Sequence, residues 1–304
     1  MDETKIYALK NEQLEIYEKF RKIGYDNAEL IFSKMIGFIK FQHKITGLPV
    51  AVVGCSGGID SSFVLAAAVK ALGTKNVKTV MLPYEGIRSS FQDSIRYATL
   101  LADYLMIPES NRIIVPILCA VDASKSSIMR SGLPKPNQKQ LGNMMARERM
   151  KILYHIADEY KGLVLDTCNN TEIKMGYLTK HGDGASDYNP IGDIYKVWIW
   201  EITRKLKLVP NEIIEREPSA DLVEGQTDVS DLGITYQALD LLLWLYFDVD
   251  IAKSSLTIDY HYPVETIDMV INRVSSNEHK SGPAPICQIM DIGEIADSIG
   301  VWDC

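Results

Sequence analysis

Short apolar runs alternate with longer amphipathic stretches along the first half of this 304-residue chain, and that alternation strongly limits the fold. The short runs are rich in β-branched residues, as buried parallel strands are, and span residues 51–55, 78–84, 112–117 and 163–168. The stretches between them repeat apolar residues every three or four positions, as helices do, and span 61–72, 89–106 and 140–160. This βαβ series predicts the α/β class, a doubly wound parallel sheet flanked by helices in a Rossmann-like three-layer sandwich.

Helical periodicity also occurs outside this series. Residues 11–43 fit one or two amphipathic helices, and further helical stretches lie near 196–206, 235–247 and 263–275. The chain contains no internal repeat, low-complexity tract or convincing linker. We therefore expect a single domain over residues 1–304, with three parts: N-terminal helices (1–48), an α/β core (49–220), and a loop with C-terminal helices (221–304).

Composition narrows the range of partners and locations. The net charge is −8, with 40 acidic and 32 scattered basic residues, so we expect no nucleic-acid partner. The N-terminus has no apolar signal region, and three aspartates interrupt the most apolar stretch, so we expect no membrane association. Five cysteines without a C-x-x-C pair argue against a disulfide framework or a zinc site and favour a reducing cytoplasm.

The loop after the first expected strand is small and polar although its flanks are apolar, because residues 54–62 read GCSGGIDSS. Gly54, Gly57 and Gly58 permit positive φ angles and close backbone approach. Its serines would lie beside the amide groups that the first turn of a helix leaves free, and such a terminus binds anions. A simple capped turn would need only one glycine and one cap. We therefore interpret the segment as a phosphate-binding loop.

Asp60 lies within this loop and has two interpretations. It could be the N-cap of the following helix. Alternatively, because a carboxylate beside a phosphate is repulsive unless a hard cation lies between them, Asp60 could bind Mg²⁺.

Two widespread phosphate loops do not match this segment, because it contains neither G-x-G-x-x-G nor G-K-[ST]. Residues 54–61 instead resemble the SGG-x-DS loop of the ATP pyrophosphatases, enzymes that cleave ATP between its α and β phosphates. This resemblance implies an adenine nucleotide alpha hydrolase-like fold.

Three further segments resemble one branch of that group, the NAD synthetases. They are DTCNNTEIKMGYLTKHGDGASDYNPIGDIYK (166–196), REPSADLVEGQTDVSDLGITYQALD (216–240) and NEHK (277–280). The resemblance runs in order from about residue 30 to residue 285. Two positions depart from the family pattern: Cys55 replaces a valine or isoleucine, and Val229 replaces the second acid of a D-E pair.

The resemblance implies a role for individual residues. Asp60 and Glu172 would be the magnesium carboxylates, and with Lys196 they would form the catalytic set. The implied ATP-binding residues are Gly54, Cys55, Ser56, Gly57, Gly58, Ile59, Asp60, Ser61, Thr167, Lys196 and Ser219. The implied deamido-NAD-binding residues are Arg147, Lys180, Asp187, His279 and Lys280.

Several of these residues also have an ordinary structural interpretation. Taken alone, Arg147 would be a solvated charge on a helix, and Glu172 and Lys180 could form surface ion pairs. Cys55 and Cys168 fit small buried apolar side chains better than nucleophiles.

The implied activity is that of a carbon–nitrogen ligase. ATP would activate the nicotinate carboxylate of deamido-NAD as an acyl adenylate, and ammonia would then give NAD, with AMP and pyrophosphate released. The segment before the first strand is too short for the amidase domain of glutamine-using relatives, so we expect free ammonia as the donor. Two alternatives remain open: another ATP pyrophosphatase-type ligase, or a non-catalytic nucleotide-binding module.

Two structural expectations accompany this interpretation. The resemblance implies a homodimer, and the apolar segment 239–247 carries aromatic residues that could contribute to its interface. Residues 219–233 lack helical or strand periodicity, and we expect them, with residues near 80–90, to order over bound ATP.

Overall fold

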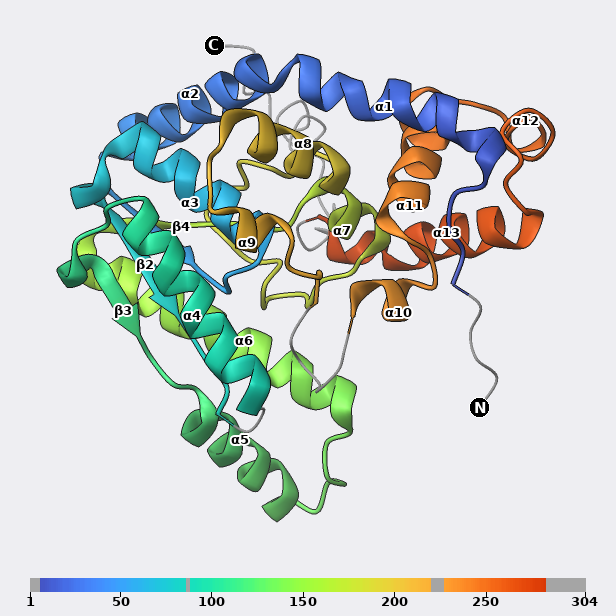
Figure 1. Ribbon diagram of the computed structural model, residues 1–304. Helices are drawn as coiled ribbons and strands as arrows, with labels where there is room; N and C mark the ends of the chain where they lie inside the picture. The colour runs from blue at the N-terminus through green and yellow to red at the C-terminus, as the bar shows by residue number, and fades with distance from the viewer. Residues whose placement is uncertain (1–5, 86–87, 220–226, 283–304) are drawn as a thin grey trace, which may run out of the picture.

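A computed structural model describes residues 6–85, 88–219 and 227–282 (Figure 1). Its centre is a parallel sheet with the strand order β3-β2-β1-β4. The strands are β1 (Val50–Gly54), β2 (Val77–Met81), β3 (Arg112–Ile114) and β4 (Gly162–Leu165). The chain builds outward from β1 to β3 and then returns to add β4 on the other side of β1. This order confirms the predicted doubly wound sheet and puts its switch point between β1 and β4.

Helices cover both faces of the sheet, so β1, β2 and β4 are buried on both sides, whereas edge strand β3 is partly exposed. Ala51 and Val53 of β1 belong to one apolar core with α3 and α4, whereas Val52 belongs to another with α5 and α6. The covering helices are α3 (Ile59–Leu72), α4 (Arg88–Tyr104), α5 (Leu118–Arg130) and α6 (Gln138–Tyr160). Burial on both faces explains why the strands read as continuous apolar runs rather than as alternating ones.

An outer layer of helices packs over α3. Its members are α1 (Leu14–Asp26), α2 (Ala28–Thr46), α8 (Lys196–Leu206) and α9 (Asn211–Ile214). The backbone of α1 closely approaches α8 at Gly24, where a Cβ atom would lie 2.8 Å from the side chain of Trp198. The amphipathic N-terminal segment is therefore two helices, divided at Asn27: α2 covers the α/β core, and Phe20 of α1 joins the apolar core of the C-terminal helices.

The remaining helices surround a separate apolar core, which we call the C-terminal helical core. They are α7 (Asn170–Met175), α10 (Asp228–Leu232), α11 (Tyr236–Leu243), α12 (Lys253–Ile258) and α13 (Val264–Asn277). Short elements complete the described chain: 3₁₀ turns at Asn11–Gln13, Thr74–Asn76, Glu109–Asn111 and Glu278–Lys280, and a π-helical turn at Trp244–Asp248.

The structure corrects one sequence expectation and leaves another open. The leucines of segment 239–247 are at most 1% exposed and fill the C-terminal helical core, whereas Phe247 is 38% exposed, so a contribution of its aromatic residues to a dimer interface stays a prediction. Segment 219–233, which was expected to lack helical periodicity, contains α10. The side chain of Thr227 caps this helix by accepting a hydrogen bond from Ser230 N. Residues 86–87 and 220–226, which belong to the expected ordering loops, lie outside the described residues.

Within the described parts of the chain, no helix is both long enough and apolar enough to span a membrane.

Candidate active site

The phosphate loop connects β1 to α3 at the switch point of the sheet. Gly57 has a φ of +76°, and a Cβ atom there would lie 2.6 Å from Cβ of Tyr97 on α4, so only glycine fits. Ser56 Oγ accepts from Gly58 N at 3.3 Å and lies 3.3 Å from Ser61 Oγ. Gly58, the N-cap of α3, supplies no capping side chain, so the first-turn amide groups face the loop and can bind an anion.

A second loop follows β4, next to β1, and carries Asn169 and Glu172. Asn169 caps α7: its Oδ1 accepts from Glu172 N, and Glu172 Oε2 accepts from Asn169 N, each at 3.0 Å. The same asparagine donates from Nδ2 to Asp60 Oδ1 at 2.9 Å. Glu172 is therefore a capping-box residue as well as a magnesium candidate, and Asn169 joins it to the phosphate loop.

Lys196 brings the two candidate carboxylates, Asp60 and Glu172, together. Its Nζ donates to Asp60 Oδ2 and lies 3.9 Å from Glu172 Oε1, and only 3% of its side chain is exposed. Burial acts to lower the pKa of Lys196, but the nearby carboxylates, above all that of Asp60, outweigh it and raise that pKa. The lysine therefore stays a buried cation between two acids at neutral pH.

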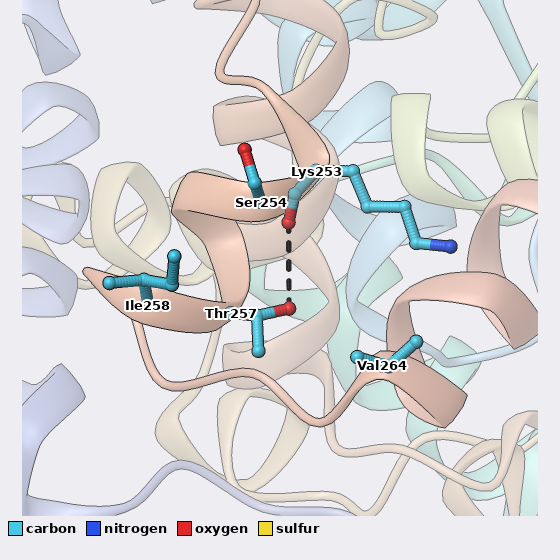
Figure 2. Close-up of a pocket in the computed structure, with 5 residues that line it drawn as sticks. All are labelled: Lys253, Ser254, Thr257, Ile258 and Val264. Carbon is cyan, nitrogen blue, oxygen red and sulfur yellow. Dashed lines mark hydrogen bonds between the residues drawn. The ribbon is translucent and has the colours of Figure 1, made fainter.

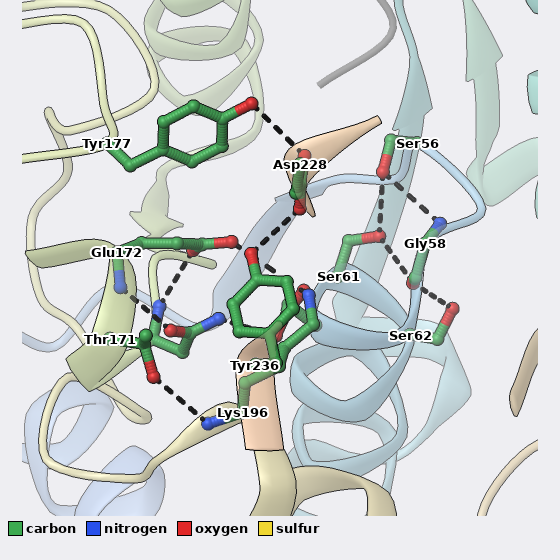
Figure 3. Close-up of polar contacts among 12 residues, drawn as sticks. Ser56, Gly58, Ser61, Ser62, Thr171, Glu172, Tyr177, Lys196, Asp228 and Tyr236 are labelled. Carbon is green, nitrogen blue, oxygen red and sulfur yellow. Dashed lines mark hydrogen bonds and ion pairs between the residues drawn. The ribbon is translucent and has the colours of Figure 1, made fainter. Parts of the chain in front are cut away.

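Asp228 adds a third carboxylate to this cluster, and the sequence analysis missed it. It accepts hydrogen bonds from Tyr236 Oη at 2.8 Å and from Tyr177 Oη at 3.2 Å (Figure 3). Burial raises the pKa of Asp228, and the charge of Lys196 opposes that shift. Burial, followed by the charge of Asp60, likewise raises the pKa of Glu172. The sequence offered one signal for Asp228: it is the remaining acid of the family's D-E pair, whose second acid is replaced by Val229.

This cluster fits a divalent cation only in combination with a ligand. Among the described residues, no three His, Cys, Asp or Glu side chains are grouped so that they could hold a metal ion. Mg²⁺, however, is typically held by one or two protein carboxylates together with water and phosphate oxygens. Asp60 and Glu172 could supply those carboxylates, because both lie beside Lys196 at the phosphate loop.

Four of the five deamido-NAD candidates form a second group. Arg147 Nε donates to the carbonyl of Lys180 at 3.2 Å, and Lys180 Nζ donates to that of His279 at 2.6 Å. Lys280 Nζ donates to the carbonyl of Gly176 at 2.7 Å. Residues far apart in sequence are thus joined on one side of α7.

Asp187 lies elsewhere. Its Oδ2 accepts from the backbone amide of Val164 in β4 at 2.7 Å, and the adjacent Tyr188 pairs with Leu165 in an isolated bridge. None of the contacts given by the described residues joins Asp187 to the Arg147–Lys180 group. The hydrogen bonds of the described residues therefore link four of the five candidates to one another and link Asp187 to β4, and a shared binding site for all five stays a prediction.

The remaining ATP-binding candidates outside the phosphate loop are Thr167 and Ser219. Thr167 follows β4 and is half-buried, and Ser219 is half-buried at the end of the second described range. Cys55 and Cys168 are free thiols, each 4% exposed, and burial raises both of their pKa values. These two cysteines therefore fit small core residues, and Cys55 fills the apolar position of the residue it replaces.

A shallow depression lies apart from this cluster, between α12 and the start of α13 (Figure 2). It is lined by Lys253, Ser254, Thr257, Ile258 and Val264. Its lining is mainly apolar, and Lys253 is paired with Asp268, so it offers little to a charged substrate.

The strand order and the phosphate loop at the switch point define the class of protein: a doubly wound α/β nucleotide-binding protein. More narrowly, the chain belongs to the NAD synthase family, whose family model matches residues 31–284.

Curated relatives and solved structures agree with this membership. The NH(3)-dependent NAD(+) synthetase of Fusobacterium nucleatum is 36% identical over 84% of this chain and 93% of its own length. That of Pyrococcus furiosus is 38% identical over 84% and 92%. Among structures, the NMN synthetase from Francisella tularensis has a TM-score of 0.73 at 27% identity, covering 86% of this chain and 99% of its own. The NH3-dependent NAD synthetase from Campylobacter jejuni has a TM-score of 0.66 at 26% identity, with the same coverage.

Proposed function

We propose that this protein is an ammonia-dependent NAD synthetase, a ligase that uses ATP to amidate deamido-NAD (nicotinic acid adenine dinucleotide) to NAD. The family membership and the curated relatives support this reaction. The structural observation that carries it is Lys196 between Asp60 and Glu172, directly beside the phosphate loop. A phosphate loop next to a buried lysine and a carboxylate pair suits ATP better than an uncharged ligand.

The reaction has two steps. The nicotinate carboxylate attacks the α-phosphorus of ATP, a P–O bond breaks, and pyrophosphate leaves. Ammonia then attacks the carbonyl carbon of the acyl adenylate, AMP leaves with the C–O bond electrons, and the nitrogen loses a proton. The amides of the phosphate loop and the Lys196 ammonium would hold the phosphates and stabilise the charge that grows on the departing pyrophosphate.

Magnesium is the proposed cofactor, held by Asp60 and Glu172. When bound, it would offset phosphate charge. The chain's own contribution is to hold the two carboxylates at the loop, Asp60 in the first turn of α3 and Glu172 in that of α7. Asn169 restrains both through its side chain.

For deamido-NAD we propose the group of Arg147, Lys180, His279 and Lys280 as one end of the binding site. The positive charges of Arg147, Lys180 and Lys280 suit a pyrophosphate or a carboxylate. Asp187 would belong to a different part of that site, and a second copy of the chain offers a way to combine the two.

A homodimer is therefore part of the proposal. Phe38, Phe41 and Ile45 share one face of α2 and are 38%, 56% and 59% exposed. Phe38 packs edge-on against Tyr188, the neighbour of Asp187, with ring centroids 5.6 Å apart. An interface on α2 would thus bring the partner close to Asp187. Light scattering of the protein and of Phe41→Asp tests this, and a monomeric mass for the unaltered protein would contradict it.

The reaction is tested by the release of AMP and pyrophosphate from ATP. We expect pyrophosphate release to require deamido-NAD, and sustained release of AMP and pyrophosphate to require ammonia as well, with NAD formed in equal amount. Release without deamido-NAD would indicate another ligase of this type. ATP binding without any release would indicate a non-catalytic module.

A second candidate product is NMN, because an NMN synthetase has the higher TM-score of the two structures compared above. The curated relatives favour NAD. Comparing kcat/KM for deamido-NAD and for its mononucleotide counterpart decides between them, and a higher value for the mononucleotide would favour NMN.

Two expectations stay within the proposal. A cytoplasmic location agrees with the free thiols of Cys55, Cys119 and Cys168. A single domain over residues 1–304 remains a prediction from the sequence.

A further inference from the structure

Asp240 on α11 is a buried acid that the proposed chemistry does not use. Its exposure is 0%, and its neighbours Leu239 and Leu241 belong to the C-terminal helical core. Burial raises the pKa of Asp240 to about 7, so keeping a carboxylate there is unfavourable. An apolar residue would pack at this position without that cost, which suggests that the carboxylate has a specific task.

Both oxygens of Asp240 have a partner, and both partners flank a candidate catalytic residue. Oδ1 accepts from Thr171 Oγ1 at 2.6 Å, and Thr171 precedes Glu172 in the first turn of α7. Oδ2 accepts from the backbone amide of Val197 at 2.8 Å, and Val197 follows Lys196 at the start of α8.

Thr171 closes the arrangement. Its Oγ1 also accepts from the backbone amide of Lys196 at 3.3 Å, as Figure 3 shows. The N-cap of α8, Tyr195, makes no side-chain capping bond. Asp240 and Thr171, from two other helices, therefore satisfy the first amides of α8 in place of a local cap. A negative group at this helix start is also favoured by the helix dipole.

We infer that Asp240 is a positioning residue: acting through Thr171, it fixes the start of α8, and with it Lys196, relative to Glu172 and the phosphate loop. This inference rests on the proposed function, because it assigns Lys196 and Glu172 to the ATP site. Side-chain packing alone would hold the helices near one another. The hydrogen bonds additionally fix the first turn of α8, from which the ammonium reaches Asp60.

An asparagine cannot fully replace this acid. Its single oxygen could accept from Val197 N, but its amide nitrogen would then face Thr171 Oγ1, which already accepts from Lys196 N. The threonine hydroxyl proton would lose its acceptor, and a buried donor without an acceptor is costly. Asp240→Asn therefore retains the shape of the side chain and disturbs its link to Thr171.

The chain offers a matched control for the threonine. Thr203 lies on α8 with 0% exposure, and its hydroxyl has no hydrogen-bond partner within the described part of the chain. Thr171→Val and Thr203→Val make the same chemical change, but only the first removes an anchor of Lys196. Thr171→Ser keeps the hydroxyl and should restore function.

The experiment measures MgATP affinity by calorimetry and steady-state kinetics for these variants and Asp240→Asn, all checked for folding by circular dichroism. We expect kcat to fall by about 10- to 100-fold in Thr171→Val and Asp240→Asn, as for a catalytic group displaced by about 1 Å. MgATP affinity should weaken in the same two variants. KM for deamido-NAD should stay near that of the unaltered protein, because Arg147 and Lys180 are held by other contacts.

The outcomes separate the two ideas. If Thr171→Val matches Thr203→Val in both kcat and MgATP affinity, the inference is wrong even when the unaltered protein makes NAD. If the unaltered protein makes no NAD, the proposed function fails. MgATP affinity then still decides the inference, and a loss confined to Thr171→Val and Asp240→Asn, with recovery in Thr171→Ser, supports it. If Asp240→Asn fails to fold, the three threonine variants decide alone.

Discussion

Gly57→Ala should destabilise the protein through a steric clash. Gly47→Ala is the control that separates this clash from the cost of the backbone conformation. Gly57 has a φ of +76°, and its added Cβ would lie 2.6 Å from Cβ of Tyr97 and 3.2 Å from the carbonyl oxygen of Ser94. Gly47 also has a positive φ, +69°, at the end of α2, but nothing lies within 4 Å of an added Cβ. Gly47→Ala therefore carries the backbone cost alone.

The two variants share one energetic cost and differ in a second one. A left-handed conformation costs a non-glycine residue about 1–2 kcal/mol, and both variants carry that term. Forcing an extra methyl group into packed surroundings costs about 1–3 kcal/mol, and only Gly57→Ala carries it. At about 2–4 °C of melting temperature per kcal/mol, Gly57→Ala should melt roughly 2–12 °C below Gly47→Ala.

Thermal melts with and without MgATP measure both consequences. Tyr97 lies on α4, across from the loop, so relief of the clash must move the phosphate loop or α4. We therefore expect MgATP to raise the melting temperature of Gly47→Ala but to raise that of Gly57→Ala much less. If both variants melt together and respond equally to MgATP, the close contact between the loop and α4 does not exist in solution.

Three further predictions concern the charged site and its nitrogen donor. Asp60→Asn and Glu172→Gln should each stop NAD formation while circular dichroism stays unchanged, because each removes a proposed magnesium carboxylate; normal turnover in either would refute that assignment. Lys196→Met leaves those acids without their buried cation, so it should bind Mn²⁺ without ATP more tightly than the unaltered protein, measured by electron paramagnetic resonance. Equal Mn²⁺ affinity would mean that the lysine does not compete for the site. Ammonium should support NAD formation and ammonia-free glutamine should not; equal rates would show that this chain uses glutamine.

Much of the α/β core could be predicted because its signals are local. The runs at 51–55 and 163–168 correspond to β1 and β4, and their continuous apolar character follows from burial on both faces. The third strand was predicted too long, because it ends at Ile114 before Pro116. Helix α5, with sequence LCAVDASKSSIMR, was missed because its only fully buried residue is Val121, so its apolar stripe is weak.

The site was only partly predictable, since its geometry comes from segments that meet only in the fold. The glycines and serines around Asp60 are a local signal, and the resemblance supplied Glu172 and Lys196. No local pattern indicates that Asn169 also bonds Asp60, and the remaining acid of the D-E pair did not by itself indicate that Asp228 joins the cluster. Asp240 was read only as an interruption of an apolar stretch, and its bonds to α7 and α8 depend on how three helices pack.

The charges of the site bear on the order in which its ligands bind. Lys196 supplies one buried positive charge, and the start of α3 adds roughly half a charge through its free amides. Asp60, Glu172 and Asp228 place three carboxyl groups beside that positive charge, so ATP phosphates alone would bring further negative charge to a site already rich in acids. A divalent cation without ATP would have to compete with Lys196 for Asp60. Bound Mg²⁺ would therefore favour ATP binding, and bound ATP would favour Mg²⁺ binding. By linkage, each of these two ligands must raise the affinity for the other by the same factor.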